Sequence, residues 1–219
     1  NLLNSFKEFC KKNKFEINYS QIKVIVELDK FLNSKKTIFN SIFKKNNKLC
    51  FYLVGSVGVG KTMILNFVYD QLNIKKLRLH FNEFMINFHD FKHNNAKKEG
   101  NLVSLFVKNL KKKYELIYLD EFQVTNIVDA MILGKLFEEI FSENIKIIIT
   151  TNIKLDDLYK DGLQREQFLP FIAVIKANSV QQELLIQDDY RIKNLDKSQR
   201  IFYPLNENTS FKINQSFHE

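Results

Sequence analysis

The sequence predicts an α/β fold in which a parallel sheet is covered by helices on both faces. Short apolar runs alternate along the chain with segments of helical periodicity. The runs are continuously apolar, as at Ile147–Ile149, which is typical of strands buried on both faces. One run ends in a glycine-rich segment that opens a helix, as in nucleotide-binding βα units. With 219 residues, of which 45% are hydrophobic, the chain is long enough for one large domain.

The expected elements follow one another in chain order. We expect a helix or two within residues 20–43, where Ile22, Val26 and Phe31 recur at helical spacing. The expected strands are Leu49–Val54, Lys76–His80, Glu115–Leu119, Ile145–Ile149 and Glu183–Ile186. The expected helices after the first strand are Lys61–Leu72, Asn82–His93, Leu102–Lys112, Asn126–Phe141, Leu155–Tyr159 and Phe168–Asn178. Pro170 suits the first turn of the last helix.

The net charge of +8 does not by itself predict nucleic-acid binding. Only four of the 33 basic residues are arginine, and the lysine runs are scattered along the chain, so we interpret them as solvated surface. No apolar stretch is long enough to span a membrane, and the first twenty residues lack a signal-peptide core. Cys10 and Cys50 share no motif, which favours unpaired thiols in a reducing, cytoplasmic setting.

The strongest motif is a predicted phosphate-binding loop that matches the pattern G-x-x-x-x-G-K-[ST]. It consists of Gly55, Ser56, Val57, Gly58, Val59, Gly60, Lys61 and Thr62. Glycines let the backbone turn several N–H groups towards phosphate oxygens, and the following helix adds its positive N-terminus. Lys61 would reach the β- and γ-phosphates, and the hydroxyl of Thr62 would ligate magnesium. The sequence therefore predicts binding of ATP and Mg²⁺.

A second motif is the hydrophobic run 116–119 that ends in Asp120 and Glu121. Such a strand would deliver Asp120 to the magnesium shell. Glu121 would polarise the attacking water, because hydrolysis needs a base within reach of the γ-phosphate. The alternative is that one of these carboxylates caps the helix that follows shortly.

Two further polar positions follow the next apolar strand. Asn152, or as a second choice Thr151, could hold the attacking water or sense the γ-phosphate; the alternative is a helix cap. Arg165 lies 13 residues after Asn152, and a guanidinium suits the transition-state phosphate oxygens better than lysine does. Arg165 could act on the nucleotide of a neighbouring subunit, or it could form a surface salt bridge.

Two other groups are weaker candidates. His89 and His93 are four residues apart on a predicted helix, a spacing that can bind zinc, but no third ligand completes a known pattern. We interpret them as ordinary surface residues. The phenylalanines of residues 81–91 recur near helical spacing and are expected in the core rather than in a base-stacking platform.

Taken together, these residues resemble the AFG-like ATPases, whose bacterial branch is the ZapE class of cell-division ATPases. The matching stretches are Tyr52–Thr62, Arg78–Met85, Leu119–Leu133, Thr150–Ile153, Leu158–Pro170 and Asp189–Arg191. The sequence LYKDGLQR followed by FLP is the most specific of them. The resemblance covers roughly residues 20–205.

This resemblance implies an AAA+-type P-loop NTPase, a three-layer sandwich with a parallel sheet of order 5-1-4-3-2. It implies ATP hydrolysis, assembly into a homo-oligomer and action on a protein partner, which for the bacterial members is the division ring near the inner membrane. It also implies an N-terminal helical segment at 1–45, an ATPase core at 46–205 and the start of a C-terminal region at 206–219. Lys61, Thr62, Asp120, Glu121 and Asn152 match nucleotide positions, and Arg165 matches a family-typical arginine.

The sequence departs from the family pattern in places. Val54 replaces a usual tryptophan, Val59 a frequent arginine and Asn82 a usual histidine. Family members also continue beyond the point that matches Glu219, so we expect a C-terminal region that is cut short.

Two other functions therefore stay open. One is a nucleic-acid-associated ATPase like a helicase loader, favoured by the +8 charge. The other is a truncated nucleotide-binding remnant with negligible turnover.

Overall fold

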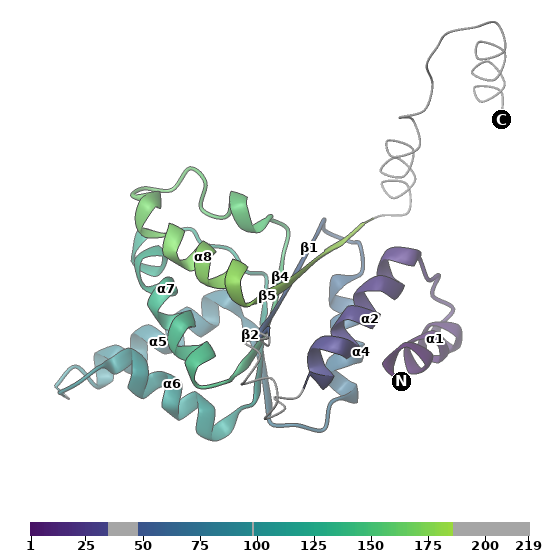
Figure 1. Ribbon diagram of the computed structural model, residues 1–219, viewed down its shortest axis with the longest axis horizontal. Coiled ribbons are helices and arrows are strands. Elements are labelled where there is room, and N and C mark those ends of the chain that lie inside the picture. The colour runs from purple at the N-terminus through teal and green to yellow at the C-terminus, as the bar shows by residue number, and fades with distance from the viewer. Residues whose placement is uncertain (35–47, 98, 186–219) are drawn as a thin grey trace, which may run out of the picture. The chain divides into compact units, whose positions relative to one another are not determined.

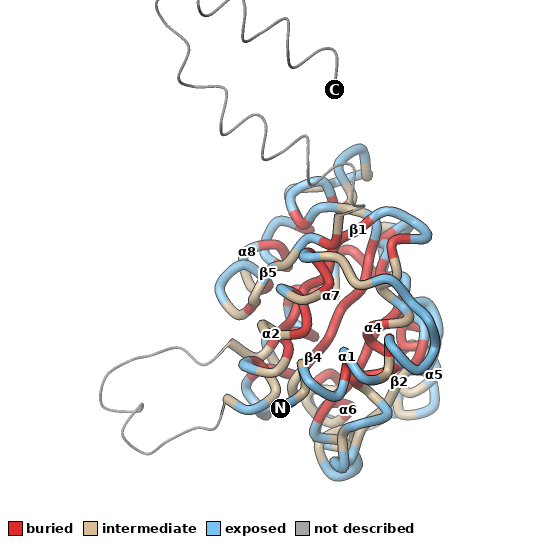
Figure 2. The backbone as a smooth tube through the Cα atoms, turned by 90° about the vertical axis from the view of Figure 1, so that its right-hand side faces the viewer, coloured by how far each residue is buried: buried red, intermediate tan, exposed pale blue. Residues whose placement is uncertain are grey.

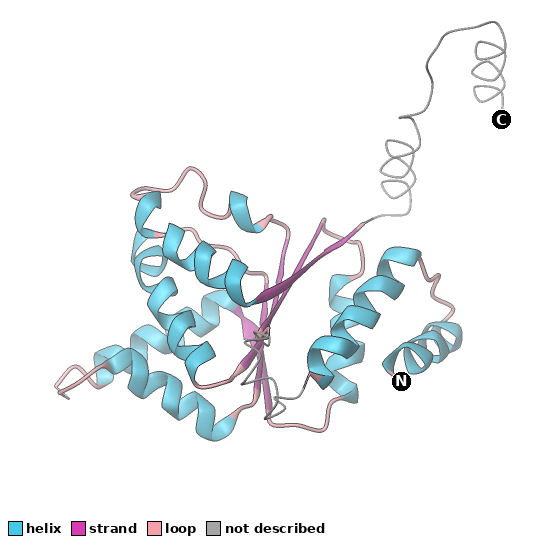
Figure 3. Cartoon of the chain, in the orientation of Figure 1, coloured by secondary structure: helices cyan, strands magenta, loops and turns pink. Residues whose placement is uncertain are grey.

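The computed structural model describes residues 1–34, 48–97 and 99–185. A parallel sheet lies between two layers of helices (Figures 1 and 3). The strands are β1 (Cys50–Gly55), β2 (Lys76–His80), β3 (Leu116–Asp120), β4 (Lys146–Thr151) and β5 (Ser179–Leu184). The α-helices are α1 (Leu2–Asn13), α2 (Tyr19–Asn33), α4 (Lys61–Gln71), α5 (Phe81–Asn94), α6 (Leu102–Lys113), α7 (Ile127–Ser142) and α8 (Leu169–Asn178). The 3₁₀ turns are η1 (Leu155–Asp157) and η2 (Arg165–Gln167).

The strand order is β2-β3-β4-β1-β5, and every strand pair is parallel. Written from the other edge, this is the predicted order 5-1-4-3-2, which is thereby confirmed. In a parallel sheet all carboxyl ends meet at one edge, and that is where ligands bind in open α/β folds. The order places the carboxyl ends of β1, β3 and β4 side by side.

The two faces of the sheet bury two separate hydrophobic clusters, because side chains alternate along each strand. On β1, Phe51 and Leu53 face the cluster formed with α1, α2 and α4. Tyr52 and Val54 face the cluster formed with α5, α6, α7 and α8. The three central strands β1, β3 and β4 are buried along most of their length (Figure 2), whereas the edge strands β2 and β5 are partly exposed. This double burial explains why the central strands are continuously apolar in sequence.

Side-chain caps fix the starts of several helices. Asn18 and Gln21 form a capping box at α2, in which each side chain binds the backbone N–H of the other. The side chain of Asn126 accepts from the backbone N–H of Asp129 at the start of α7. No side chain caps α4, which begins directly after Gly60. The backbone N–H groups in the first turn of α4 are therefore not occupied by a capping side chain.

The structure differs from the sequence expectations at three elements. Helix α1 lies within the helical segment expected at 1–45, but its bounds were not predicted; it packs through Phe6 and Cys10 onto the cluster formed with α2 and α4. The expected last strand at 183–186 is wrong in its start, since β5 begins at Ser179 directly after α8. The turn η2 was also not expected.

Other expectations fall partly or wholly outside the described residues. These are the helical residues 35–43, Ile186, the motif at 189–191 and the proposed boundaries at 45, 205 and 206. Cys10 and Cys50 are both buried and unpaired. Among the described residues, no helix is long and apolar enough to cross a membrane.

Candidate nucleotide site

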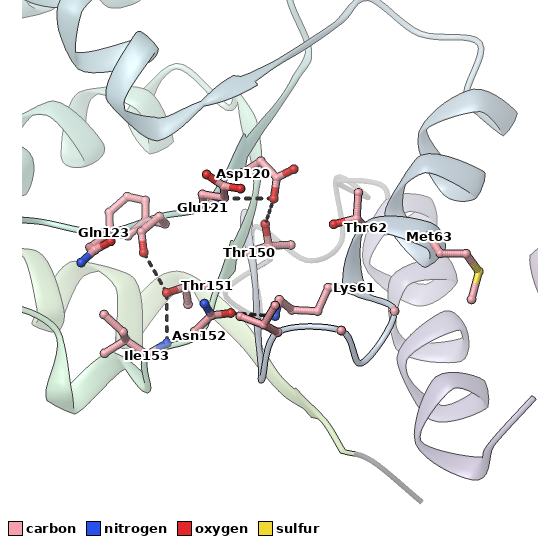
Figure 4. A pocket seen from close by; sticks show the side chains of 14 residues that line it. Lys61, Thr62, Met63, Asp120, Glu121, Gln123, Thr150, Thr151, Asn152 and Ile153 are labelled. Carbon is pink, nitrogen blue, oxygen red and sulfur yellow. Dashed lines mark hydrogen bonds between the residues drawn. The ribbon is translucent and has the colours of Figure 1, made fainter.

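A cavity of about 690 Å³ opens at the carboxyl ends of β1, β3 and β4 (Figure 4). Pockets of this size commonly hold small ligands. The lining residues come from the predicted loop, from the start of α4 and from the turns after β3 and β4. They are Val57, Gly58, Gly60, Lys61, Thr62, Met63, Asp120, Glu121, Phe122, Gln123, Thr150, Thr151, Asn152 and Ile153.

The loop between β1 and α4 has the backbone conformation that its glycines permit. Gly58 and Gly60 have φ angles of 83° and 92°, in the left-handed region that other residues rarely adopt. Gly55 is required for a different reason, because a Cβ there would lie 2.8 Å from the carbonyl oxygen of Leu184 in β5. The loop therefore turns tightly into α4. The uncapped N-terminus of α4 carries a partial positive charge, which favours the binding of an anion.

Lys61, the first residue of α4, lines the cavity. Its ammonium donates to the carbonyl oxygens of Gly55 and Ser56 and, at 2.8 Å, to the side-chain oxygen of Asn152. Burial lowers the pKa of Lys61, and the nearby charge of Asp120 partly offsets that effect. The structure thus brings together a residue of the loop and a residue that follows β4, 91 positions away in sequence.

Asp120 ends β3 with both carboxylate oxygens engaged. Its Oδ1 accepts from the hydroxyl of Thr150, and its Oδ2 accepts from the guanidinium of Arg78 at 2.9 Å. Burial would raise the pKa of this carboxyl, but the hydrogen bonds from Thr150 and Arg78 outweigh burial and hold the pKa below its ordinary value. Asp120 is therefore a fixed carboxylate beside the loop.

Glu121 follows with its side chain 80% exposed. Its φ of 52° is in the left-handed region, an uncommon conformation for a non-glycine residue. This turn directs Glu121 along the cavity wall while the next residue, Phe122, packs into the core. His80, at the end of β2, lies with its Nδ1 3.6 Å from the Oε2 of Glu121.

Buried hydrogen bonds join the turns that follow β3 and β4. The backbone N–H of Phe122 donates to the carbonyl of Thr150, and the hydroxyl of Thr151 donates to the carbonyl of Phe122, both at 2.8 Å. The Phe122 ring packs between Phe81 and Phe171, with centroid distances of 4.1 and 5.6 Å. Glu121 and Asn152 therefore project from turns that are tied to each other. Thr151, the second-choice sensor, is used in this connection.

The cavity presents the group types that bind a phosphate chain and a hard cation. Backbone N–H groups at the start of a helix and an ammonium suit phosphate, and a hydroxyl with a carboxylate suits magnesium. In Figure 4 the hydroxyl of Thr62 points from α4 towards Thr150 and Asp120. Thr62 and Asp120 are the residues that could hold Mg²⁺, and Lys61 with the loop is the part that could hold phosphates.

Some predicted residues do not line this cavity. Gly55, Ser56 and Val59 are absent from its walls, and the side chain of Val59 is buried beside α4. Arg165 lies in η2 and donates from Nη2 to the carbonyl of Asp156 at 2.7 Å. Arg165 thus does not reach the cavity of its own chain.

His89 and His93, the weaker candidates, do not line the cavity. His89 Nε2 lies 2.6 Å from Asp129 Oδ1, which links α5 to the start of α7. Within the ranges that the structure describes, no group of three or more potential metal ligands is found. Phe81, Phe84 and Phe88 are buried in the core, as expected.

Sequence reasoning missed several residues of the site. Thr150 and Arg78 hold Asp120, while Met63, Phe122 and Gln123 line the cavity. Thr150 could have been found as a polar residue at the end of an apolar strand. Arg78 carried a weaker signal, an arginine in a chain that nearly always uses lysine.

Comparison with known proteins supports the same fold and family. The AFG1-like ATPase family matches residues 11–219. Lactation elevated protein 1 homolog B of Danio rerio is 35% identical over 164 residues, which cover 70% of this chain and 33% of that protein. Cell division protein ZapE of Escherichia coli strain K12 is 33% identical over 165 residues, which cover 75% of this chain and 44% of that protein. The chain thus spans less than half the length of these two relatives.

Among solved structures, DnaI is similar with a TM-score of 0.53 and 21% identity, covering 78% of this chain and 89% of that chain. This likeness concerns the fold alone and, with the strand order, confirms the predicted AAA+-type P-loop fold. The family match covers nearly the whole chain and includes every residue of the cavity. The chain belongs to the AFG1-like ATPase family.

Proposed function

We propose that the cavity binds ATP with Mg²⁺ and hydrolyses the terminal phosphoanhydride bond. The observation that carries this proposal is the convergence of Lys61, Asp120, Glu121 and Asn152 on one cavity at the sheet edge. A positively charged loop, a fixed carboxylate and an exposed carboxylate are the parts that phosphoryl transfer to water requires.

Each residue has a distinct part in this proposal. The loop at residues 55–62 and Lys61 bind the phosphates, and Thr62 and Asp120 hold the magnesium ion, which would neutralise phosphate charge. Glu121 accepts a proton from the attacking water. Asn152 orients that water, or exchanges its contact with Lys61 for one with the γ-phosphate.

We further propose that the protein acts on a protein partner as a homo-oligomer. The relative from Escherichia coli is named a cell division protein, which supports a partner in the division machinery. Arg165 supports assembly, because it lies outside the cavity of its own chain and could serve a neighbouring one. A guanidinium supplied in this way stabilises the charge of the transferring phosphoryl group.

The test is phosphate release from ATP in the presence of Mg²⁺, with Glu121→Gln as the matched variant. This substitution keeps the size of the side chain but removes the base. We expect turnover to fall by about 10²- to 10⁴-fold while ATP binding is unchanged. Equal turnover by both chains would overturn the proposed role of Glu121, and no turnover by either would favour a non-hydrolysing nucleotide-binding protein.

A further inference from the structure

Arg78 is not among the residues that line the cavity, but it contacts Asp120, which lines it. It comes from β2, and its guanidinium donates to Asp120 Oδ2 at 2.9 Å and to the side-chain oxygen of Asn66 on α4. The guanidinium also lies over the ring of Tyr118, with 4.8 Å from Cζ to the ring centroid. Arg78 therefore joins β2, β3 and the helix that follows the loop.

The sheet register explains how Arg78 reaches Asp120. Arg78 pairs with Tyr118 across the β2–β3 ladder, and Asp120 lies two residues beyond Tyr118 on the same face of the sheet. That face is the one covered by α4. An arginine side chain is long enough to span this diagonal.

Asn66 ties the same guanidinium to the helix that carries Thr62. Thr62 and Asn66 are four residues apart on α4, so they lie on one face of the helix. Arg78 thus contacts Asp120 directly and contacts the helical face of Thr62 one turn away. Asp120 and the helix that carries Thr62 are therefore linked through one planar group.

A lysine could not make both contacts with fixed geometry. The guanidinium has five N–H donors in a rigid plane, whereas an ammonium is a single point charge on a flexible stem. The Asp120 side chain is 12% exposed, so it depends on partners rather than on water for its orientation. Thr150 holds only Oδ1, which leaves Oδ2 to Arg78.

We propose that Arg78 is a positioning residue for magnesium, which holds Asp120 and α4 in the arrangement that lets Asp120 and Thr62 share the ion. This inference rests on the proposed Mg·ATP function. Groups behind metal ligands commonly change metal affinity by about 10- to 100-fold when removed.

The positive charge of Arg78 and its positioning role have opposite effects on magnesium affinity. The direction in which the affinity changes therefore tests the inference. A guanidinium close to a cation site repels the cation, so loss of its charge alone would strengthen magnesium binding. Loss of positioning would weaken it. The direction of the change therefore separates a positioning role from simple charge repulsion.

The experiment measures equilibrium binding of a fluorescent, non-hydrolysable ATP analogue as free Mg²⁺ is titrated, and in excess EDTA. We expect Arg78→Gln to raise the half-saturating Mg²⁺ concentration about tenfold or more, with affinity in EDTA close to that of the unsubstituted chain. Arg78→Lys should shift it in the same direction by less. Lys75→Gln is the matched control, since it removes one positive charge from an exposed side chain three residues away.

The outcomes distinguish failure of the positioning role of Arg78 from failure of the proposed Mg·ATP function. An unchanged or lowered half-saturating Mg²⁺ concentration in Arg78→Gln would overturn the positioning role. If Arg78→Gln does not fold, as judged by circular dichroism, Asn66→Ala and Arg78→Lys replace it. Because both keep the positive charge at position 78, charge repulsion predicts no change, whereas loss of positioning predicts a raised half-saturating Mg²⁺ concentration. Failure of the unsubstituted chain to bind the analogue, or to respond to Mg²⁺, would overturn the proposed function itself.

Discussion

The side-chain oxygen of Asn152 lies 2.8 Å from the ammonium of Lys61. This contact joins the residue after β4 to the first residue of α4, across the mouth of the cavity. Under the proposed function, the amide lies beside the ammonium that we assign to the phosphates. We therefore propose that Asn152 exchanges its contact with Lys61 for one with the γ-phosphate when a nucleotide binds.

Replacement of Asn152 should affect hydrolysis more than binding. We expect Asn152→Ala to lower turnover by about 10²-fold, because a group that orients water or phosphate in the transition state is lost. ATP affinity should change little, since Lys61 and the loop remain. Steady-state kinetics measure the turnover, and a binding titration measures the ATP affinity. The control is Asn73→Ala, which changes an exposed residue in a loop. Unchanged turnover would assign Asn152 a structural role.

The pKa of Asp120 predicts a pH dependence of stability. Because its folded-state pKa is below the ordinary 3.8, Asp120 stabilises the fold above that pH, and the stabilisation disappears as pH falls through the lower folded value. Asp120→Asn should therefore lower the melting temperature near neutral pH. The difference from the unsubstituted chain should shrink below about pH 4. Thermal melts by circular dichroism at a series of pH values measure it; a constant difference would contradict this account.

Arg165 should be needed for turnover but not for binding. We expect Arg165→Ala to lower turnover by about 10³-fold, since a guanidinium at the transferring phosphate contributes that much in related chemistry. A mixture of Arg165→Ala and Glu121→Gln chains should regain activity, because each supplies the group that the other lacks. Turnover per chain should also rise with protein concentration. Full activity of the Arg165→Ala chain would contradict this role and favour the alternative of a surface salt bridge for Arg165.

The central strands were predictable because burial on both faces leaves a continuous apolar signal. For β5 a strand was predicted but its start was wrong, because it is an edge strand whose exposed positions carry polar residues such as Gln181 and Glu183. Its start at Ser179 is therefore hidden in a polar stretch. Within the helical segment expected at 1–45, the bounds of α1 were not predicted for a related reason, since only Phe6 and Cys10 of its twelve residues are buried.

The cavity itself was predictable where residues are neighbours in sequence. The loop before α4 and the pair Asp120-Glu121 each form a short motif with a chemical reason for every position. Arg78 was not assigned a role, because its contact with Asp120 depends on the β2–β3 register between residues 42 positions apart. The position of Arg165 outside the cavity of its own chain also depends on how the chain folds, so no local sequence pattern could predict it.

The most direct test of the proposed ATP site is equilibrium binding of ATP with Mg²⁺ to the unsubstituted chain and to Lys61→Ala. The ammonium of Lys61 is the one lysine charge that lines the cavity within the described residues. Its loss should weaken ATP binding by about 10²-fold, the scale of a lost charge-assisted hydrogen bond, while the melting temperature stays close to that of the unsubstituted chain. Equal ATP affinity of the two folded chains would contradict the assignment of this cavity as the nucleotide site.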